Sequence, residues 1–253
     1  SDYFTTKLFT GNGSSNAISG VGFQPDWIWF KNRTATQSHA IVDSVRGREG
    51  LQSNTDEADY TLNSGKDFGT FDSDGFTVLT PEQLNSFNYN TGSIVAWNWK
   101  AGTSFTNDAS STSIRSIDSA GSVSDVSGFS IVSFTGTGSN GTIKHGLSTA
   151  PNLFIIKRLD ADNDWRVGSS ALTNFVKHVN LNTTAVESDL AAAFNSTGPT
   201  TSVFSVGTSV STNADGGTYI AYCFSSIKGY SKVGSYTGNG STDGTFIYTG
   251  FKP

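Results

Sequence analysis

Two short acidic stretches carry residues whose types and spacing suit a metal ion. One contains Asp72 and Asp74, separated by a serine, and the other contains Asp160, Asp162 and Asp164, separated by single residues. Alternating carboxylates of this kind begin calcium-binding loops, in which oxygen atoms are the ligands. We therefore treat the five aspartates as candidate calcium ligands, and calcium is the one cofactor that the sequence leaves open.

The alternative interpretation of both stretches is a solvated acidic turn. The second stretch has Trp165 where the invariant glycine of an EF-hand loop belongs, and Ala171 where its bidentate glutamate would lie. The first stretch is followed directly by Gly75 and a β-like run, which is typical of a turn that leads into a strand.

Hydrolytic chemistry has little support in the sequence. A glycosidase needs two carboxylates that face each other across a cleft, yet the chain has only four glutamates and no pair that stands out. The sequence contains no Gly-x-Ser-x-Gly nucleophile motif. His145 follows a lysine in a turn-like stretch and is predicted to lie at the surface. We therefore predict no catalytic residues and a protein that is not an enzyme.

Four tryptophans lie on two apolar stretches that are predicted strands, "DWIWFKN" and "SIVAWNWKAG"; they are Trp27, Trp29, Trp97 and Trp99. Tryptophans in a β protein favour either core packing or a platform for sugar rings. Their counterparts in a second stretch of the chain are also bulky and apolar, which indicates core packing. Trp165, in the polar run "DADNDWRV", is predicted to be the exposed indole.

The densest charge lies in residues 38–59, which include Arg46 and Arg48. One interpretation is a polar edge strand and loop. The other is an interface with a partner subunit or a cell-surface ligand, because arginine is enriched in such contacts. The candidate interface residues are therefore Arg46, Arg48 and Trp165.

The sequence contains an internal duplication, and the repeated unit is the fold that positions these side chains. The pattern aromatic-Thr-Gly-x-Gly-Ser begins at Phe9, Phe134 and Tyr236. In the first two copies an apolar stretch follows, and a second anchor, Ala96 or Ala221, lies 87 residues after the aromatic residue. Two anchors with one spacing indicate that a unit was copied along the chain.

Turn signals and short alternating stretches give each unit an all-β character. Frequent Asn-Gly and Asp-Gly pairs predict tight turns, and only residues 187–196 are typical of a helix. We predict tandem β-sandwich units, jelly-roll-like, with short loops and at most one short helix. The predicted boundaries are a first unit at 1–102, a Ser/Asp-rich connector at 103–127 with a strand around 112–117, and a second unit at 128–233.

Residues 234–253 repeat the opening of the unit. We predict a strand at 245–248, either as the start of a third repeat or as a closing strand of the second unit. The chain begins with "SDYF", without an initiator methionine or a secretion signal, so we expect it to be processed or cut from something longer.

Composition excludes several classes of function. The formal net charge is −5 and the 16 basic residues are scattered, which gives no electrostatic reason to expect nucleic acid. A single cysteine, Cys223, excludes an internal disulfide and a thiolate zinc cluster. No apolar run approaches the ~20 residues of a membrane-spanning helix, so we expect no membrane insertion.

Several phrases together resemble a domain family of unknown function found in bacteriophage tail-fibre and virion structural proteins, common in marine phages. They include "LFTGNGSSNAISGVGFQPDWIWFKNR", "HAIVDSVRG", "GTFDSDGFTV", "IVAWNWKAG" and "GYSKVGSYTGNGSTDGTFIYTGFKP". The resemblance covers nearly the whole chain and carries no catalytic residues.

The resemblance implies a non-enzymatic protein carried on a phage particle and a homo-oligomer, such as a trimer, and it implies nothing about a receptor. Our hypothesis is a virion surface protein, either a tail fibre or a decoration module, that serves structural display and host-surface adhesion, with other virion proteins and a host-surface glycan as partners. The alternative is a carbohydrate-binding module attached to, or part of, a glycan-degrading enzyme.

Overall fold

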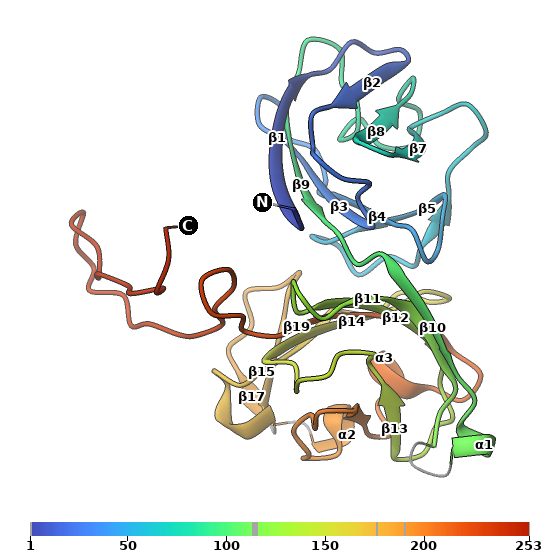
Figure 1. The fold of residues 1–253 in the computed structure, drawn as a ribbon, viewed down its shortest axis with the longest axis vertical. Coiled ribbons are helices and arrows are strands. Elements are labelled where there is room, and N and C mark those ends of the chain that lie inside the picture. The colour runs from blue at the N-terminus through green and yellow to red at the C-terminus, as the bar shows by residue number, and fades with distance from the viewer. Residues whose placement is uncertain (1, 113–115, 176, 190, 253) are drawn as a thin grey trace.

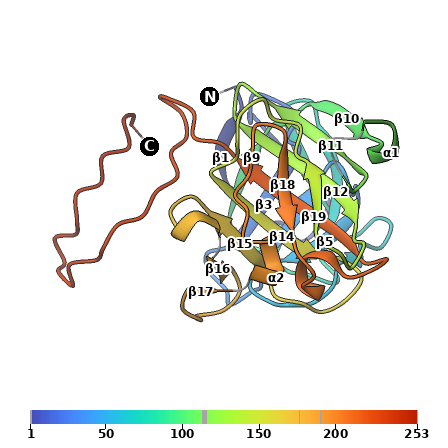
Figure 2. The ribbon, with the colours of Figure 1, turned by 90° about the horizontal axis from the view of Figure 1, so that it is seen from below.

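The computed structural model describes residues 2–112, 116–175, 177–189 and 191–252. These residues form four layers of β-sheet, with two large sheets face to face in the middle and a small sheet on each outer side (Figure 1). The C-terminal segment extends away from the layers, as both views show (Figure 2). The all-β sandwich class is therefore confirmed.

The first half of the chain contains a six-stranded sheet in the order β1-β9-β3-β4-β5-β6 and a three-stranded sheet in the order β2-β8-β7, all antiparallel. The large sheet consists of β1 (Phe4–Thr10), β9 (Ser93–Trp99), β3 (Trp27–Asn32), β4 (Ala40–Asp43), β5 (Glu49–Gln52) and β6 (Tyr60–Thr61). The small sheet consists of β2 (Asn16–Ser19), β8 (Gly75–Val78) and β7 (Phe68–Asp72).

The second half contains an eight-stranded sheet in the order β10-β11-β12-β19-β14-β15-β16-β17 and the pair β13-β18. The large sheet consists of β10 (Thr103–Asn107), β11 (Ser119–Ser124), β12 (Phe129–Thr135), β19 (Thr218–Phe224), β14 (Leu153–Arg158), β15 (Arg166–Ser169), β16 (Lys177–Asn180) and β17 (Ser188–Asp189). The pair consists of β13 (Gly141–Lys144) and β18 (Val203–Val206). Short helices are α1 (Ala109–Thr112), α2 (Ala191–Phe194), α3 (Val210–Asn213) and the 3-10 turn η1 (Thr173–Phe175).

The two halves share strand order and register, as the predicted duplication requires. The order β12-β19-β14-β15-β16-β17 repeats β1-β9-β3-β4-β5-β6. Phe9 is paired with Ile94 in the first half, and Phe134 is paired with Tyr219 in the second, at the corresponding positions. The second half differs in having β10 and β11 beyond β12, whereas β1 lies at the edge of its sheet.

Each of the two glycines in the repeated phrase is required for a different physical reason. Gly13 and Gly138 have φ of +68° and +69°, a left-handed conformation that glycine adopts without a steric cost. The first glycine, Gly11 or Gly136, lies so close to a neighbouring backbone carbonyl that no side chain would fit. In the second half, the amide of the buried Asn213 bridges this turn: its Oδ1 accepts from the Thr137 N–H at 2.8 Å.

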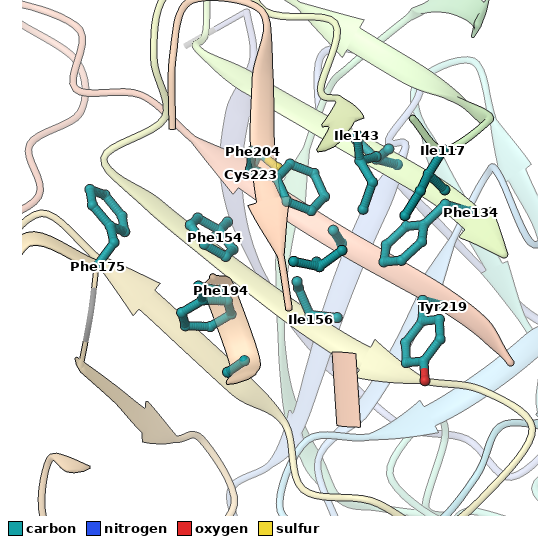
Figure 3. Close-up of a cluster of buried hydrophobic side chains, with 14 of the residues drawn as sticks. Ile117, Phe134, Ile143, Phe154, Ile156, Phe175, Phe194, Phe204, Tyr219 and Cys223 are labelled. Carbon is teal, nitrogen blue, oxygen red and sulfur yellow. The ribbon is translucent and has the colours of Figure 1, made fainter. Parts of the chain in front are cut away.

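Each sandwich has its own core. In the first half, Phe30, Phe68, Phe76 and Phe87 fill the space between the large and small sheets. Figure 3 shows the equivalent core of the second half, where Phe134, Phe154, Phe194 and Phe204 gather under β13, β18 and α2. These clusters explain the high phenylalanine content, because ring side chains fill the ~10 Å gap between packed sheets.

A third core joins the two large sheets. Trp27, Ile41 and Leu51 of the first half pack on Ile155 and Tyr222 of the second, together with further apolar side chains from both sheets; the others that are fully part of this cluster are Ala101, Phe129, Ile131, Trp165, Val167 and Ile220. The two halves therefore share buried apolar surface and are not independent domains joined only by a linker.

Three details of the predicted elements need correction. Residues 103–127 contain two strands, β10 and β11, rather than a connector with one strand, and part of the predicted strand at 112–117 lies outside the described residues. The predicted helix at 187–196 is reduced to the single turn of α2, one of three short α-helices in the described residues. The predicted strand at 245–248 is wrong for this chain, since those residues form no strand.

Candidate functional site

A cleft of about 510 Å³ opens on the face of the first large sheet that turns toward the second half, beside the junction of the two halves. Three of its walls are the indoles of Trp29, Trp97 and Trp99, each partly exposed. Phe4, Lys31 and His39 complete the lining. The volume lies within the range of about 300–1,000 Å³ that is typical of small-molecule sites.

Strand register places the three indoles on one face. Trp29 lies opposite Trp97 across the β3–β9 pair, and Trp99 lies opposite Phe4 across the β1–β9 pair. Because alternate residues of a strand share a face, the WxW spacing brings all these rings to the same side. The ring centroids of Trp29 and Trp97 are 6.2 Å apart with planes at 69°, so the two rings form a corner rather than a stack.

The polar groups of the cleft are few and oriented. Lys31 Nζ donates to the carbonyl of Asn32 at 2.8 Å and to that of Gln37 at 3.5 Å. Partial burial, with the nearby Lys31 charge second, lowers the pKa of His39 below its ordinary value, so the imidazole is neutral at pH 7. A neutral imidazole carries one donor and one acceptor, and can hydrogen-bond to a hydroxyl group in either sense.

The second half contains the same face, but there it is covered. Ile155 and Tyr222 are the repeat counterparts of Trp29 and Trp97, and both lie in the shared core between the halves. Lys157, the counterpart of Lys31, is fully buried, and its Nζ donates to the Asp56 carbonyl of the first half at 3.1 Å. The two large sheets are therefore offset, and the offset leaves Trp29, Trp97 and Trp99 partly exposed, although Trp27 of the same face is buried in the shared core.

The prediction that the four tryptophans fill the core applies fully only to one of them. Trp27 is buried in the shared core, with its ring centroid 4.7 Å from that of Tyr222. Trp29 and Trp99 are partly buried and pack against the same core while they line the cleft, and Trp97 lines the cleft without being part of that cluster. Lys31 and His39 were not among the predicted site residues. No local feature of the sequence distinguishes them from other polar residues at the end of a strand.

The Arg46 side chain is buried at the junction of the two halves. Its Nε donates to Asp43 Oδ2 at 2.7 Å, and both side chains are nearly inaccessible to solvent. The Tyr222 hydroxyl of the second half donates to the same carboxylate oxygen at 2.8 Å. Burial beside the Asp43 carboxylate raises the pKa of Tyr222 well above its ordinary value. This charged, hydrogen-bonded group ties β4 of one half to β19 of the other.

The other two candidate interface residues have internal partners as well. The prediction that Trp165 is exposed is wrong: it is fully buried, and its Nε1 donates to the Gln52 carbonyl across the junction at 3.1 Å. Arg48 binds the loop between β6 and β7 by donating to the carbonyls of Asn63 and Lys66. Arg46, Arg48 and Trp165 each make contacts within this chain, and an interface with a partner in residues 38–59 stays an untested prediction.

Each aspartate of the first acidic stretch accepts hydrogen bonds from donors of the protein. Asp72 accepts from the hydroxyls of Thr70 and Thr77, each at 2.7 Å. Asp74 accepts from the backbone N–H groups of Gly22 and Gly20, at 2.6 and 2.9 Å. These backbone bonds lower the pKa of Asp74 below its ordinary value. The stretch is a structured turn between β7 and β8.

The aspartates of the second acidic stretch connect neighbouring loops through an ion pair and hydrogen bonds. Asp160 pairs with Arg158 at 2.9 Å, and Asp162 accepts from the Ala58 N–H at 2.9 Å. Asp164 accepts from the side-chain amides of Asn180 and Asn182. In the described ranges, no three acidic, histidine or cysteine side chains come together as metal ligands, and calcium remains an untested prediction.

His145 is buried, so the prediction of a surface histidine is wrong. Its Nε2 is 3.1 Å from the Thr200 carbonyl, and its Nδ1 accepts from the Leu147 N–H at 3.2 Å. Both ring nitrogens therefore have partners in the protein, and the ring holds the turn after β13 against the segment before β18.

A wider groove of about 910 Å³ lies along β10, β11 and β12. Its walls are mostly small polar side chains and glycine, and its carboxylate, Asp118, accepts from the Ala109 N–H at 2.7 Å. The groove offers neither converging charges nor exposed rings, so we assign it no chemistry.

The fold and the cleft define a tandem β-sandwich protein with an open aromatic face. The chain belongs to the family described as "Domain of unknown function (DUF7483)", whose model matches residues 1–253. No curated protein and no solved structure matches the chain. None of the helices in the described residues has the length and apolar character needed to cross a bilayer.

Proposed function

We propose that the protein is a non-enzymatic display and adhesion module of a phage particle, and that it binds a host-surface glycan in the tryptophan cleft. The observation that carries the proposal is the set of three partly exposed indoles, Trp29, Trp97 and Trp99, on one open face. Exposed apolar surface of this kind marks interaction sites in proteins that otherwise bury their rings.

The chemistry of the cleft favours a carbohydrate. A pyranose ring has a face made mainly of C–H groups, which packs on an indole, and a rim of hydroxyls that needs polar partners. The neutral His39 imidazole can serve as such a partner at the cleft edge.

The scaffold supports display rather than catalysis. The cleft lining contains no carboxylate, and a glycosidase needs two. Shared cores and buried pairs such as Asp43–Arg46 hold the face rigid without a disulfide. Copies of a weak site arrayed on a particle would bind a glycan surface with raised effective concentration. The virion setting itself comes from the sequence resemblance.

The test is a glycan array followed by calorimetry on the glycans that bind. Trp97→Ala should weaken binding about 30-fold, equivalent to ~2 kcal/mol, because truncation of a central aromatic removes its packing. Tyr89→Ala is the matched control, since Tyr89 is an exposed aromatic of the same half outside the cleft lining. Equal affinity of the two variants, or no glycan bound by the wild type, would refute the site.

The same measurement separates the alternatives. Release of oligosaccharide from a bound glycan would contradict the non-enzymatic proposal. A carbohydrate-binding module of a glycan-degrading enzyme would use the same cleft, and it would be found with that enzyme rather than on particles. Antibody labelling of purified phage particles distinguishes the two.

A further inference from the structure

The C-terminal segment, residues 230–252, carries the repeated phrase without the packing that the phrase has elsewhere. Gly240 has φ of +68°, the value found at the equivalent glycines of both halves. In both halves, a neighbouring backbone carbonyl lies so close to the first glycine of the phrase that no side chain would fit there. At Gly238, by contrast, an added Cβ would meet no atom within 4 Å. The segment thus has the local turn and lacks the surface against which that turn packs.

The segment also exposes an aromatic, β-prone stretch. Phe246 and Tyr248 are 88% and 72% exposed, and Tyr236 is 67% exposed. Alternating aromatic and β-branched residues suit a strand that pairs on at least one side. Figure 2 shows the segment as a long excursion away from the layers.

Among the described strands, those of the kind that receives this phrase already have a neighbour on each side. In each half the opening strand pairs with the last strand, β1 with β9 and β12 with β19. β9 lies between β1 and β3, and β19 lies between β12 and β14, so both are paired on both sides. Among the described strands, neither β9 nor β19 therefore has a free side for a third opening strand.

An open sheet edge is nevertheless present at β1. Among the described strands, β1 has a neighbour on one side only, whereas its repeat counterpart β12 is covered on that side by β11. The fold therefore accommodates a strand at this position. β1 has one charged residue, Lys7, and no proline, and its Leu8 is 59% exposed. Native edge strands are usually protected by charge, proline or a covering element.

We propose that the stretch from Thr245 to Thr249 adds as a strand to the β1 edge of a second copy of this chain, and that the exchange is reciprocal. Both ends of the segment lie beside the start of β1 of their own chain, because Tyr230, Ser231, Lys232 and Phe251 line a cleft together with Phe4. Two copies with β1 edges facing each other would each present a segment to the other edge. Strand addition supplies main-chain hydrogen bonds, and a two-fold arrangement closes the assembly.

Sedimentation velocity of the full chain across the micromolar range tests the proposal. The wild type should shift from monomer to dimer with concentration, and a Phe246→Ser/Tyr248→Ser double variant should remain monomeric with an unchanged unfolding midpoint. Val186→Ser is the matched control, because Val186 is an 85% exposed apolar residue outside both elements. A wild type that stays monomeric throughout, or a double variant that dimerises like the wild type, overturns the proposal.

Cross-linking identifies the contact and separates it from pairing within one chain. Leu8→Cys and Phe246→Cys are made in separate proteins, mixed, and treated with a short bis-maleimide; the native Cys223 is buried. The mixture should give a cross-linked dimer in excess of either protein alone. Equal yields would overturn the proposed pairing. The result does not depend on glycan binding, so either proposal can fail without the other.

Discussion

Lys157 allows a sharp test of how the two halves are joined. The side chain is fully buried between them, and its Nζ donates to the carbonyls of Arg158 at 2.7 Å and Asp56 at 3.1 Å. Burial lowers the pKa of Lys157 from 10.5 to about 8, although nearby aspartates, Asp162 first, oppose the shift. Folding below pH 8 therefore carries the cost of a buried ammonium group.

The sign and size of the pH effect follow from proton linkage. Below about pH 8 the lysine is protonated in both states, and the full cost, about 3 kcal/mol for a pKa lowered from 10.5 to about 8, opposes folding. Between about pH 8 and pH 10.5 the unfolded chain holds a proton that the folded chain has lost, so this contribution rises with pH. Above that window the cost is gone.

The variant Lys157→Met isolates this contribution from other groups that titrate in the same range. At pH 7 we expect stability to change by less than about 2 kcal/mol, because relief of the buried charge is offset by an unpaired Arg158 carbonyl. The Asp56 carbonyl keeps a partner, the Asn163 N–H at 2.8 Å. From about pH 7 to pH 10 the wild type should gain roughly 2–3 kcal/mol relative to the variant.

Urea unfolding of both proteins at a series of pH values measures the difference in free energy of unfolding. Lys31→Met is the matched control, since Lys31 makes the equivalent pair of backbone bonds at a partly exposed position and reports the cost of losing them. A difference between wild type and Lys157→Met that stays flat across pH would refute the inference that Lys157 is charged and buried between the halves.

Three further perturbations test other parts of the structure. Tyr222→Phe should destabilise the protein by about 1.5–3 kcal/mol, because the buried Asp43 carboxylate loses a hydrogen bond, and chemical unfolding measures the loss. Burial raises the pKa of the Cys223 thiol to about 12, so the folded protein at pH 8 should not react with a thiol reagent, whereas the urea-unfolded chain should react at once. Removal of calcium with a chelator should leave the unfolding midpoint unchanged, because each of the five candidate aspartates is engaged by donors of the protein; a fall in the midpoint would establish a structural calcium site.

The duplication could be predicted because the local backbone conformation requires the same residue type at the repeated positions. Left-handed φ at Gly13 and Gly138 and the tight backbone approach at Gly11 and Gly136 restrict those positions to glycine, so the phrase survives in the sequence. Alternation along the strands likewise predicted which residues share a face, and the register of Trp29 opposite Trp97 agrees with it.

What the sequence could not reveal is how the halves pack on each other. Trp165 was predicted to be exposed because its neighbours in sequence are acidic, yet its ring is covered by Gln52 and the shared core of the other half. Burial of Lys157 has the same cause. Such contacts join residues about a hundred positions apart, and no local pattern records them. His145 was missed for a related reason, since its partner Thr200 lies on a distant segment.

The open cleft is itself a consequence of duplication followed by offset packing. If the two copies packed with strict two-fold symmetry, the faces around Tyr222 and Trp97 would be covered equally. Instead, the second-half face is buried by Trp27 and by the 52–59 loop, while the first-half face keeps its partly exposed indoles. Substitution of Tyr222 and Ile155 by tryptophan would overfill a closed core, whereas indoles fit at Trp97 and Trp29 because that side is open. The two copies therefore differ in the way that their packing permits: one has a face inside the shared core, and the other keeps partly exposed indoles beside it.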